Sequence, residues 1–175
     1  MEHLHAPWRI EYILAPKPRA DQSVFTRIAQ SSDDVAHHVL ARERTCYAVL
    51  NTYPYNGGHL MVVPYKQTAS LDGLTEQELL DLLLLTRRCL DALKRTMHPD
   101  GFNLGMNLGR VAGAGVEDHL HIHIVPRWNG DTNFMPVLAN TSVVPEALQD
   151  VAARLRQALA EDRAGGAETG GLAAG

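Results

Sequence analysis

The sequence predicts an α+β domain built on an antiparallel sheet of about five strands, with one long helix and a C-terminal helix. Short apolar, partly β-branched runs follow one another with tight turns between them, which is typical of antiparallel strands. One strong helical pattern falls between two groups of strands, whereas a parallel sheet would alternate single strands with helices. The length of 175 residues suits one domain with its own core.

The chain is expected to begin with an extended arm, residues 1–22, which contains three prolines and little periodicity. A short apolar patch and a polar loop follow. "HHVLARERTCYAVLN" at 37–51 predicts two strands around a charged turn, because its runs are short, apolar and partly β-branched. "TYPYNGG" at 52–58 has the residues of a tight turn, and "HLMVVPY" at 59–65 predicts a buried strand.

The clearest helix covers residues 75–97, where leucines recur on one face. Thr75 is a suitable N-cap, and Glu78, three positions later, completes a capping box. The "PDG" run at 99–101 then ends the helix.

Two more strands and a second helix are expected beyond this point. "GFNLGMNLGR" at 101–110 predicts a strand that ends in a turn, and the run up to Pro126 predicts the last strand. Proline suits the first helical position, so the C-terminal helix is expected from Pro145 to the end of the domain, which we place at residues 23–162. Residues 163–175 are small and glycine-rich, which indicates a disordered tail.

Composition excludes several classes of function. A formal net charge of −4 argues against a DNA- or RNA-binding protein, which needs a basic surface. The N-terminus has no apolar signal core, and the longest apolar run, "LLDLLLL", is too short to span a membrane. The two cysteines are far apart in the sequence, as is usual in a reducing compartment. A cytoplasmic protein is therefore expected.

"EDHLHIHIVPRW" at 117–128 is the main functional signal. On a strand, His119, His121 and His123 point to one face while the intervening apolar residues point into the core. The first and third imidazoles start about 13 Å apart, since each two-residue step advances roughly 6.5–7 Å. All three cannot bind one metal ion, although two neighbours can. An elongated ligand such as a polyphosphate fits the row better, and a purely structural role is the remaining alternative.

"HLHIHIV" resembles the His-φ-His-φ-His-φ-φ signature of the histidine triad (HIT) nucleotide hydrolases and transferases, where φ is an apolar residue. The resemblance extends over residues 23–135. "NLGRVAGAGVEDHLHIHIVPRW" is similar to the bacterial branch that includes diadenosine tetraphosphate phosphorylases. The resemblance implies that His121 attacks the α-phosphate and forms a nucleotidyl-histidine intermediate.

The resemblance assigns further roles around this nucleophile. His119 and His123 would orient His121 and stabilise charge on the phosphoryl oxygens. His59 matches the family's fourth histidine, with a structural role at a strand end as the alternative. Asn51 matches the ribose contact. Family base-pocket positions fall on apolar residues that suit a plain core equally well: Val24, Phe25, Ile28, Leu50 and Met61.

The loop before the triad and the segment after it complete the predicted site. Asn107 matches a phosphate contact. The loop has no hydroxyl residue, so backbone N–H groups from Gly113 through Gly115 to Val116 are expected to replace one. Arg110 is either a phosphate contact or a solvated turn residue. Trp128, with its neighbour Arg127, either holds a second nucleoside or closes the sheet at a dimer interface.

Many bacterial relatives bind zinc through a Cys-x-x-Cys motif and histidines, and this chain has lost those ligands. Ser23 and Thr26 stand at the cysteine positions and Gln67 at a histidine position, so no structural zinc is expected. No cofactor is predicted, although Mg²⁺ can arrive with a polyphosphate substrate. The family usually forms homodimers side by side, and the helix at 75–97 and the C-terminal segment are candidate contacts.

Three classes of function follow. The favoured one is an enzyme that splits dinucleoside polyphosphates, with phosphorolysis of diadenosine tetraphosphate to ATP and ADP ahead of hydrolysis of diadenosine polyphosphates or nucleoside phosphoramidates. Inorganic phosphate is then a second substrate. A nucleotide-binding sensor or interaction module with weak turnover uses the same pocket. A metalloenzyme that binds zinc through His119 and His121 is the third.

Overall fold

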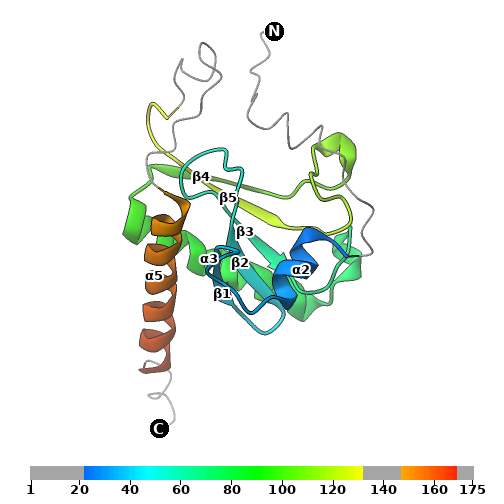
Figure 1. Ribbon diagram of the computed structural model, residues 1–175, viewed down its shortest axis with the longest axis horizontal. Coiled ribbons are helices and arrows are strands. Elements are labelled where there is room, and N and C mark those ends of the chain that lie inside the picture. The colour runs from blue at the N-terminus through cyan, green and yellow to red at the C-terminus, as the bar shows by residue number, and fades with distance from the viewer. Residues whose placement is uncertain (1–21, 132–146, 169–175) are drawn as a thin grey trace.

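The structure is a computed structural model that describes residues 22–131 and 147–168, with side chains up to residue 162 (Figure 1). The predicted N-terminal arm, apart from Gln22, and the predicted helix start at Pro145 lie outside the described residues. The elements in chain order are α2 (Val24–Gln30), β1 (Val39–Arg42), β2 (Cys46–Leu50), β3 (Leu60–Pro64), η2 (Leu71–Gly73), α3 (Glu76–Met97), β4 (Gly101–Gly105), η3 (Arg110–Ala112), β5 (Ile122–Arg127) and α5 (Leu148–Glu168).

Five strands form one antiparallel sheet in the order β1-β2-β3-β5-β4, which confirms the predicted α+β class. β5 lies between β3 and β4, and Met61 pairs with His123 across the β3–β5 ladder. The histidine strand is therefore next to the strand that follows His59. The turn between β2 and β3 requires Gly58, which has φ +74° and would bring a Cβ within 2.7 Å of Met97 Sδ.

The helix side of the sheet holds the larger core. α3 and α5 pack against each other and against the sheet, and buried aliphatic side chains fill the space between them. α3 begins at the predicted capping box, where the Thr75 hydroxyl accepts from the Glu78 N–H and the Glu78 carboxylate accepts from the Thr75 N–H. It ends at His98, whose left-handed backbone (φ +49°) stops the helical hydrogen bonding.

α2 covers the opposite side of the sheet, where the sequence predicted only an apolar patch (Figure 1). The Ser23 Oγ caps it by accepting from the Thr26 N–H. Arg42 donates to three carbonyls at the C-terminal end of α2, and the buried Tyr47 hydroxyl donates to the Phe25 carbonyl at 2.8 Å. The smaller core below α2 consists of Phe25, Val39, Tyr47, Val49, Met61 and Val63.

The C-terminal helix differs from the prediction at its end. α5 continues to Glu168, so residues 163–168 are helical, although the sequence placed them in a disordered tail. Elongating a formed helix needs no new nucleus, so the helix can continue through this run although two of its six residues are glycine. Residues 169–175 lie outside the described part of the chain. Among the helices described, none has both the length and the apolar run needed to cross a membrane.

Candidate active site

The three histidines of the signature lie at the start of β5, on the side of the sheet that α2 covers. The strand begins at Ile122, so His119 and His121 precede it and His123 is inside it. The apolar residues between them belong to the helix-side core: Leu120, Ile122 and Ile124. The predicted alternation of imidazoles and core residues is therefore present.

His121 has the nitrogen arrangement of a nucleophile. Its Nδ1 lies 3.0 Å from the carbonyl oxygen of His119, which can only accept, so Nδ1 holds the proton and Nε2 keeps a lone pair. Burial lowers the pKa of His121 and favours the neutral ring, although the bond to the His119 carbonyl opposes this. The Phe25 ring lies 4.8 Å away between centroids.

His59 and His123 form a hydrogen-bonded pair beside His121. The Tyr55 backbone N–H donates to His59 Nδ1 at 3.1 Å, so the His59 proton lies on Nε2. That Nε2 donates to His123 Nδ1 at 3.0 Å, which leaves a hydrogen on His123 Nε2. The His121 and His123 ring centroids are 4.6 Å apart. His121 Nε2 therefore has a lone pair, and Nε2 of the neighbouring His123 ring has an N–H donor.

The His119 ring is not placed for one of the two roles predicted for it, the stabilisation of charge on phosphoryl oxygens. Its side chain is fully buried, its Nε2 donates to the Pro64 carbonyl at 2.8 Å, and its Nδ1 lies 2.6 Å from the Ser23 hydroxyl. Burial lowers the pKa of His119, which keeps the ring neutral. Because both nitrogens are engaged, the ring has no group left to stabilise phosphoryl oxygens. His119 contacts His121 through its backbone carbonyl.

Three of the five residues predicted for the base pocket lie on the histidine side of the sheet. Phe25 and Met61 are buried on the histidine side, and Ile28 packs against the same cluster. Val24 is 40 % exposed on α2. Leu50 is a correction: its side chain belongs to the helix-side core, because strand residues alternate between the two faces and its neighbours in sequence face the histidines. It therefore cannot line a base pocket beside the triad.

The two predicted asparagine contacts lie in different surroundings. Asn51 is buried, its Oδ1 accepts from the Tyr53 N–H at 2.9 Å, and its Nδ2 lies 3.4 Å from His59 Nδ1. This position beside the histidine pair agrees with a ribose contact. Asn107 is partly exposed, and its Nδ2 makes a long contact of 3.4 Å to the Gly113 carbonyl. Its phosphate contact stays a prediction.

The loop before the triad forms a tight turn. The Gly113 and Ala114 N–H groups donate to carbonyls at the start of the same turn, at 3.0 and 3.3 Å. The Gly113 N–H is therefore committed within the loop, which corrects its assignment as a phosphate donor. For Gly115 and Val116 that role stays a prediction. Arg110 is exposed at the start of the turn.

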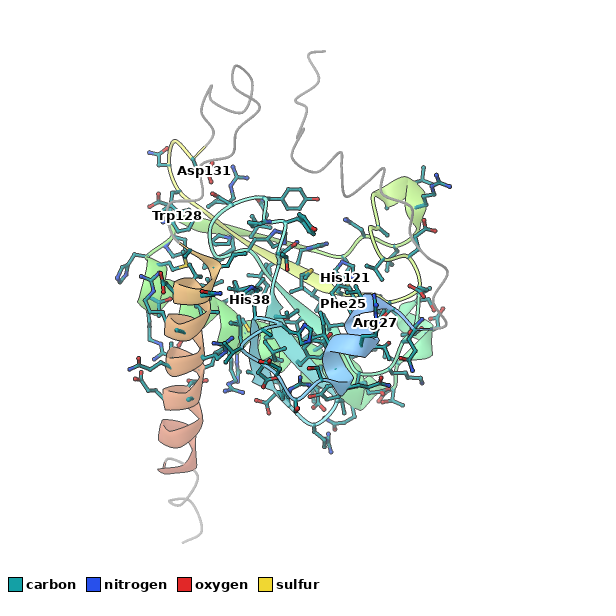
Figure 2. The ribbon with its side chains drawn as sticks, in the orientation of Figure 1. Phe25, Arg27, His38, His121, Trp128 and Asp131 are labelled. Atoms are coloured by element: carbon teal, nitrogen blue, oxygen red, sulfur yellow. The ribbon has the colours of Figure 1, made fainter. Side chains whose placement is uncertain are left out.

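Trp128 does not face the triad. Its indole Nε1–H donates to the Met97 carbonyl at the end of α3, at 3.3 Å, and Figure 2 shows it at the far end of β5 from His121. Arg127 forms an ion pair with Asp131 at 2.6 Å. The predicted clamp on a second nucleoside is therefore wrong for Trp128, because the two-residue period of the strand turns it to the helix side.

Sequence reasoning missed how several residues support the histidines. Ser23, Thr26 and Gln67 were considered only as lost metal ligands, yet they lie together beside His119. Tyr55 stacks on His59, with centroids 5.1 Å apart and 14° between ring planes. The Asn-Gly-Gly turn predicted the loop of Tyr55 but not the backbone donor within it.

The HIT domain family matches residues 32–130. The chain is 43% identical over 157 residues to a protein of Mycobacterium tuberculosis (strain ATCC 25618 / H37Rv) named AP-4-A phosphorylase, covering 86% of this chain and 80% of the relative. It is 32% identical over 97 residues to the bis(5'-nucleosyl)-tetraphosphatase [asymmetrical] of Schizosaccharomyces pombe, covering 55% of this chain and 53% of the relative.

Comparison with solved structures agrees with this family match. A zinc-bound histidine triad family protein from Mycobacterium smegmatis superposes with a TM-score of 0.66 at 26% sequence identity, covering 82% of this chain and 97% of the other. The sheet order, the alternation of histidines and core residues around His121, and the extent of the family match all agree with membership of this family. The chain belongs to the histidine triad (HIT) family.

Proposed function

We propose that the protein cleaves dinucleoside polyphosphates at an α-phosphate through a nucleotidyl-His121 intermediate. The favoured reaction is phosphorolysis of diadenosine tetraphosphate to ATP and ADP. The observation that carries the proposal is the hydrogen bond from His121 Nδ1 to the His119 carbonyl, which leaves Nε2 as a neutral nucleophile. The name of the M. tuberculosis relative, AP-4-A phosphorylase, supports the choice of substrate.

In the first step, His121 Nε2 attacks the α-phosphorus. A P–N bond forms, and the bond from phosphorus to the bridging oxygen of the departing ATP breaks. His123 Nε2–H gives its proton to this bridging oxygen as the oxygen gains charge, since the hydrogen bond from His59 makes Nδ1 the acceptor and keeps the His123 proton on Nε2.

In the second step, an oxygen of inorganic phosphate attacks the same phosphorus and the P–N bond breaks. ADP leaves, the electron pair returns to His121 Nε2, and the phosphate proton passes to His123 Nε2, which gave up its own proton in the first step. The intermediate divides one difficult displacement into two easier ones.

Hydrolysis is the second candidate, because water can attack the intermediate in place of phosphate. The S. pombe relative named as an asymmetrical tetraphosphatase supports it. The two reactions differ in one product, since phosphate gives ADP and water gives AMP.

The test is a product assay on diadenosine tetraphosphate with and without inorganic phosphate. We expect ADP and ATP in equal amounts when phosphate is present, with labelled phosphate recovered in ADP. His121→Asn should abolish both products, and His37→Asn, an exposed histidine outside the site, is the matched control. AMP as the main product in the presence of phosphate would favour the hydrolase. Nucleotide binding without turnover by the native protein would favour the sensor.

A homodimer is also proposed, with α3 rather than the C-terminal helix at the contact. α5 packs within its own chain against α3 and β1, whereas leucines of α3 and of the edge strand β4 are exposed. These leucines are Leu80, Leu83, Leu84 and Leu104. Light scattering should find a dimer that Leu83→Glu separates, while Val35→Glu, also at an exposed site, leaves it intact. A monomeric native protein would contradict this.

The remaining expectations concern metals and location. We propose that Mg²⁺ arrives only with the polyphosphate and that no resident cofactor is needed. Among residues 22–131 and 147–168, no group of three or more His, Cys, Asp or Glu residues could hold a metal ion. Cys46 and Cys89 are free thiols, which agrees with a cytoplasmic location. The net charge of −4 does not favour nucleic acid as a partner.

A further inference from the structure

Three polar residues from two separate parts of the chain meet beside His119. Ser23 and Thr26 belong to the start of α2, and Gln67 follows β3. The Ser23 hydroxyl lies 2.6 Å from His119 Nδ1, and the Thr26 hydroxyl lies 2.8 Å from Gln67 Oε1. Ser23 is 6 % exposed and His119 is 0 % exposed, so this contact is closed to water.

The direction of each hydrogen bond can be assigned. His119 Nε2 faces the Pro64 carbonyl and must donate, so Nδ1 accepts the Ser23 hydroxyl proton. Gln67 Oε1 accepts from both the Ser23 N–H, at 3.0 Å, and the Thr26 hydroxyl. The Gln67 amide nitrogen then donates to Asp118 at 2.7 Å. Each donor in the cluster has one acceptor, and the neutral form of His119 is the one that fits.

The family includes a zinc-bound member, but these residues do not fit a zinc ion. Zinc is bound by cysteine, histidine or carboxylate groups, and the cluster has two of these, His119 and the Asp118 carboxylate, which already accepts from the Gln67 amide. Both nitrogens of His119 are already engaged, by Ser23 and by Pro64. The cluster therefore needs a role other than zinc binding.

We propose that Ser23, Thr26 and Gln67 are positioning residues, which hold the His119 segment so that its carbonyl fixes the proton of the nucleophile His121, without a metal ion. The catalytic part of this inference rests on the proposed function. None of the three residues reaches the reacting atoms.

The backbone around His119 explains why such support is needed. His119 and His121 precede β5 and are outside its ladder of strand hydrogen bonds. The Leu120 N–H bond to the Thr68 carbonyl, at 2.7 Å, holds the segment from one side. The bonds to the His119 ring hold it from the other. A shift of His119 would move the carbonyl that keeps the His121 proton on Nδ1, and the attacking lone pair depends on that proton.

An exchange of two groups tests the assigned directions. Gln67→Glu places a carboxylate oxygen where the amide now donates to the Asp118 carboxylate, so the two negative charges repel. We expect kcat to fall about tenfold with KM little changed. Adding Asp118→Asn supplies an amide donor to that oxygen and should restore most of kcat. A double variant no better than Gln67→Glu overturns the assignment.

Removing the hydroxyl tests the contact to His119. Ser23→Ala should lower kcat by about 10- to 100-fold, while Ser23→Thr, which keeps the hydroxyl, should stay within about threefold of native. Gln22→Ala, at the exposed neighbouring position, is the control and should match the native protein. If Ser23 has a merely structural role, Ser23→Ala lowers the melting temperature and the fraction of active molecules but leaves kcat per folded molecule unchanged. That result overturns the proposal.

A readout without substrate separates this inference from the proposed function. Nitrogen NMR of ¹⁵N-histidine protein should find His121 protonated on Nδ1 and His119 on Nε2, and Ser23→Ala should mix the two forms of His121. If native protein turns over no dinucleotide but these signals behave as stated, the proposed function fails and the positioning role stands. The opposite tautomer of His121, or one zinc ion per purified chain, overturns the inference.

Discussion

The two sides of the sheet use the same strands in opposite ways. The helix side is filled by aliphatic side chains from the strands, α3 and α5. The α2 side holds most of the buried polar residues, and each takes part in a hydrogen bond: Ser23, Asn51, His59, His119 and His121. The candidate site is thus separated from the larger core by one layer of backbone, so substitutions in the two should have different effects.

The sharpest test of this separation is His121→Asn. Turnover should fall by at least about a thousandfold, because no other side chain can replace the attacking nitrogen. The free energy of unfolding should change by only about 1 kcal/mol, since the asparagine amide can still donate to the His119 carbonyl. Product formation and urea unfolding measure the two effects. A variant with a tenth of native turnover would remove His121 from the nucleophile's role.

Leu155→Ala is the reciprocal test on the helix side. Leu155 is fully buried on α5, so losing its side chain should cost about 3 kcal/mol of unfolding free energy. At a temperature where the variant stays folded, kcat should be within about twofold of native. Loss of kcat without loss of stability would mean that the two sides are coupled through the sheet.

The pH dependence of stability should come from the α2 side. Burial lowers the pKa of His119 and His121 below the value near 6.5 of an unfolded chain. Their contribution is complete above that value and is lost as pH falls toward the lowered values, because the unfolded chain then binds more protons.

Each histidine can contribute a slope of at most about 1.4 kcal/mol per pH unit. Urea unfolding between pH 7.5 and 5.5 should show a smaller slope for His121→Asn and an unchanged slope for Leu155→Ala. Equal slopes in the native protein and His121→Asn would exclude His121 as a source.

The smallest effect concerns the cysteines of the helix side. Burial raises the pKa of Cys46 and of Cys89 to about 12, so both thiols should resist Ellman's reagent in the folded protein. Both should react after unfolding in urea. Rapid labelling of the native protein would mean that this core opens easily.

Elements with a repeated pattern or a local signature could be predicted from the sequence. The capping box at Thr75 located α3, and apolar runs with tight turns gave the strands. α2 was missed because seven residues contain barely two helical turns. Its position depends on distant contacts, such as the bond from the Tyr47 hydroxyl to the Phe25 carbonyl.

In the candidate site, too, local patterns could be predicted from the sequence and distant contacts could not. The two-residue period of a strand gave the common face of the three histidines, and the same period turns Trp128 and Leu50 away from them. Those two errors could have been avoided by counting along the strand. The contact between Ser23 and His119 joins residues 96 positions apart, and nothing local in the sequence predicts it.

The anchors of the histidine row are mostly main-chain groups: the Tyr55 N–H, the Pro64 carbonyl and the His119 carbonyl. Main-chain groups survive substitution of the residues that bear them. An engineer can therefore replace the apolar residues around the histidines while the main-chain hydrogen bonds that orient the rings remain.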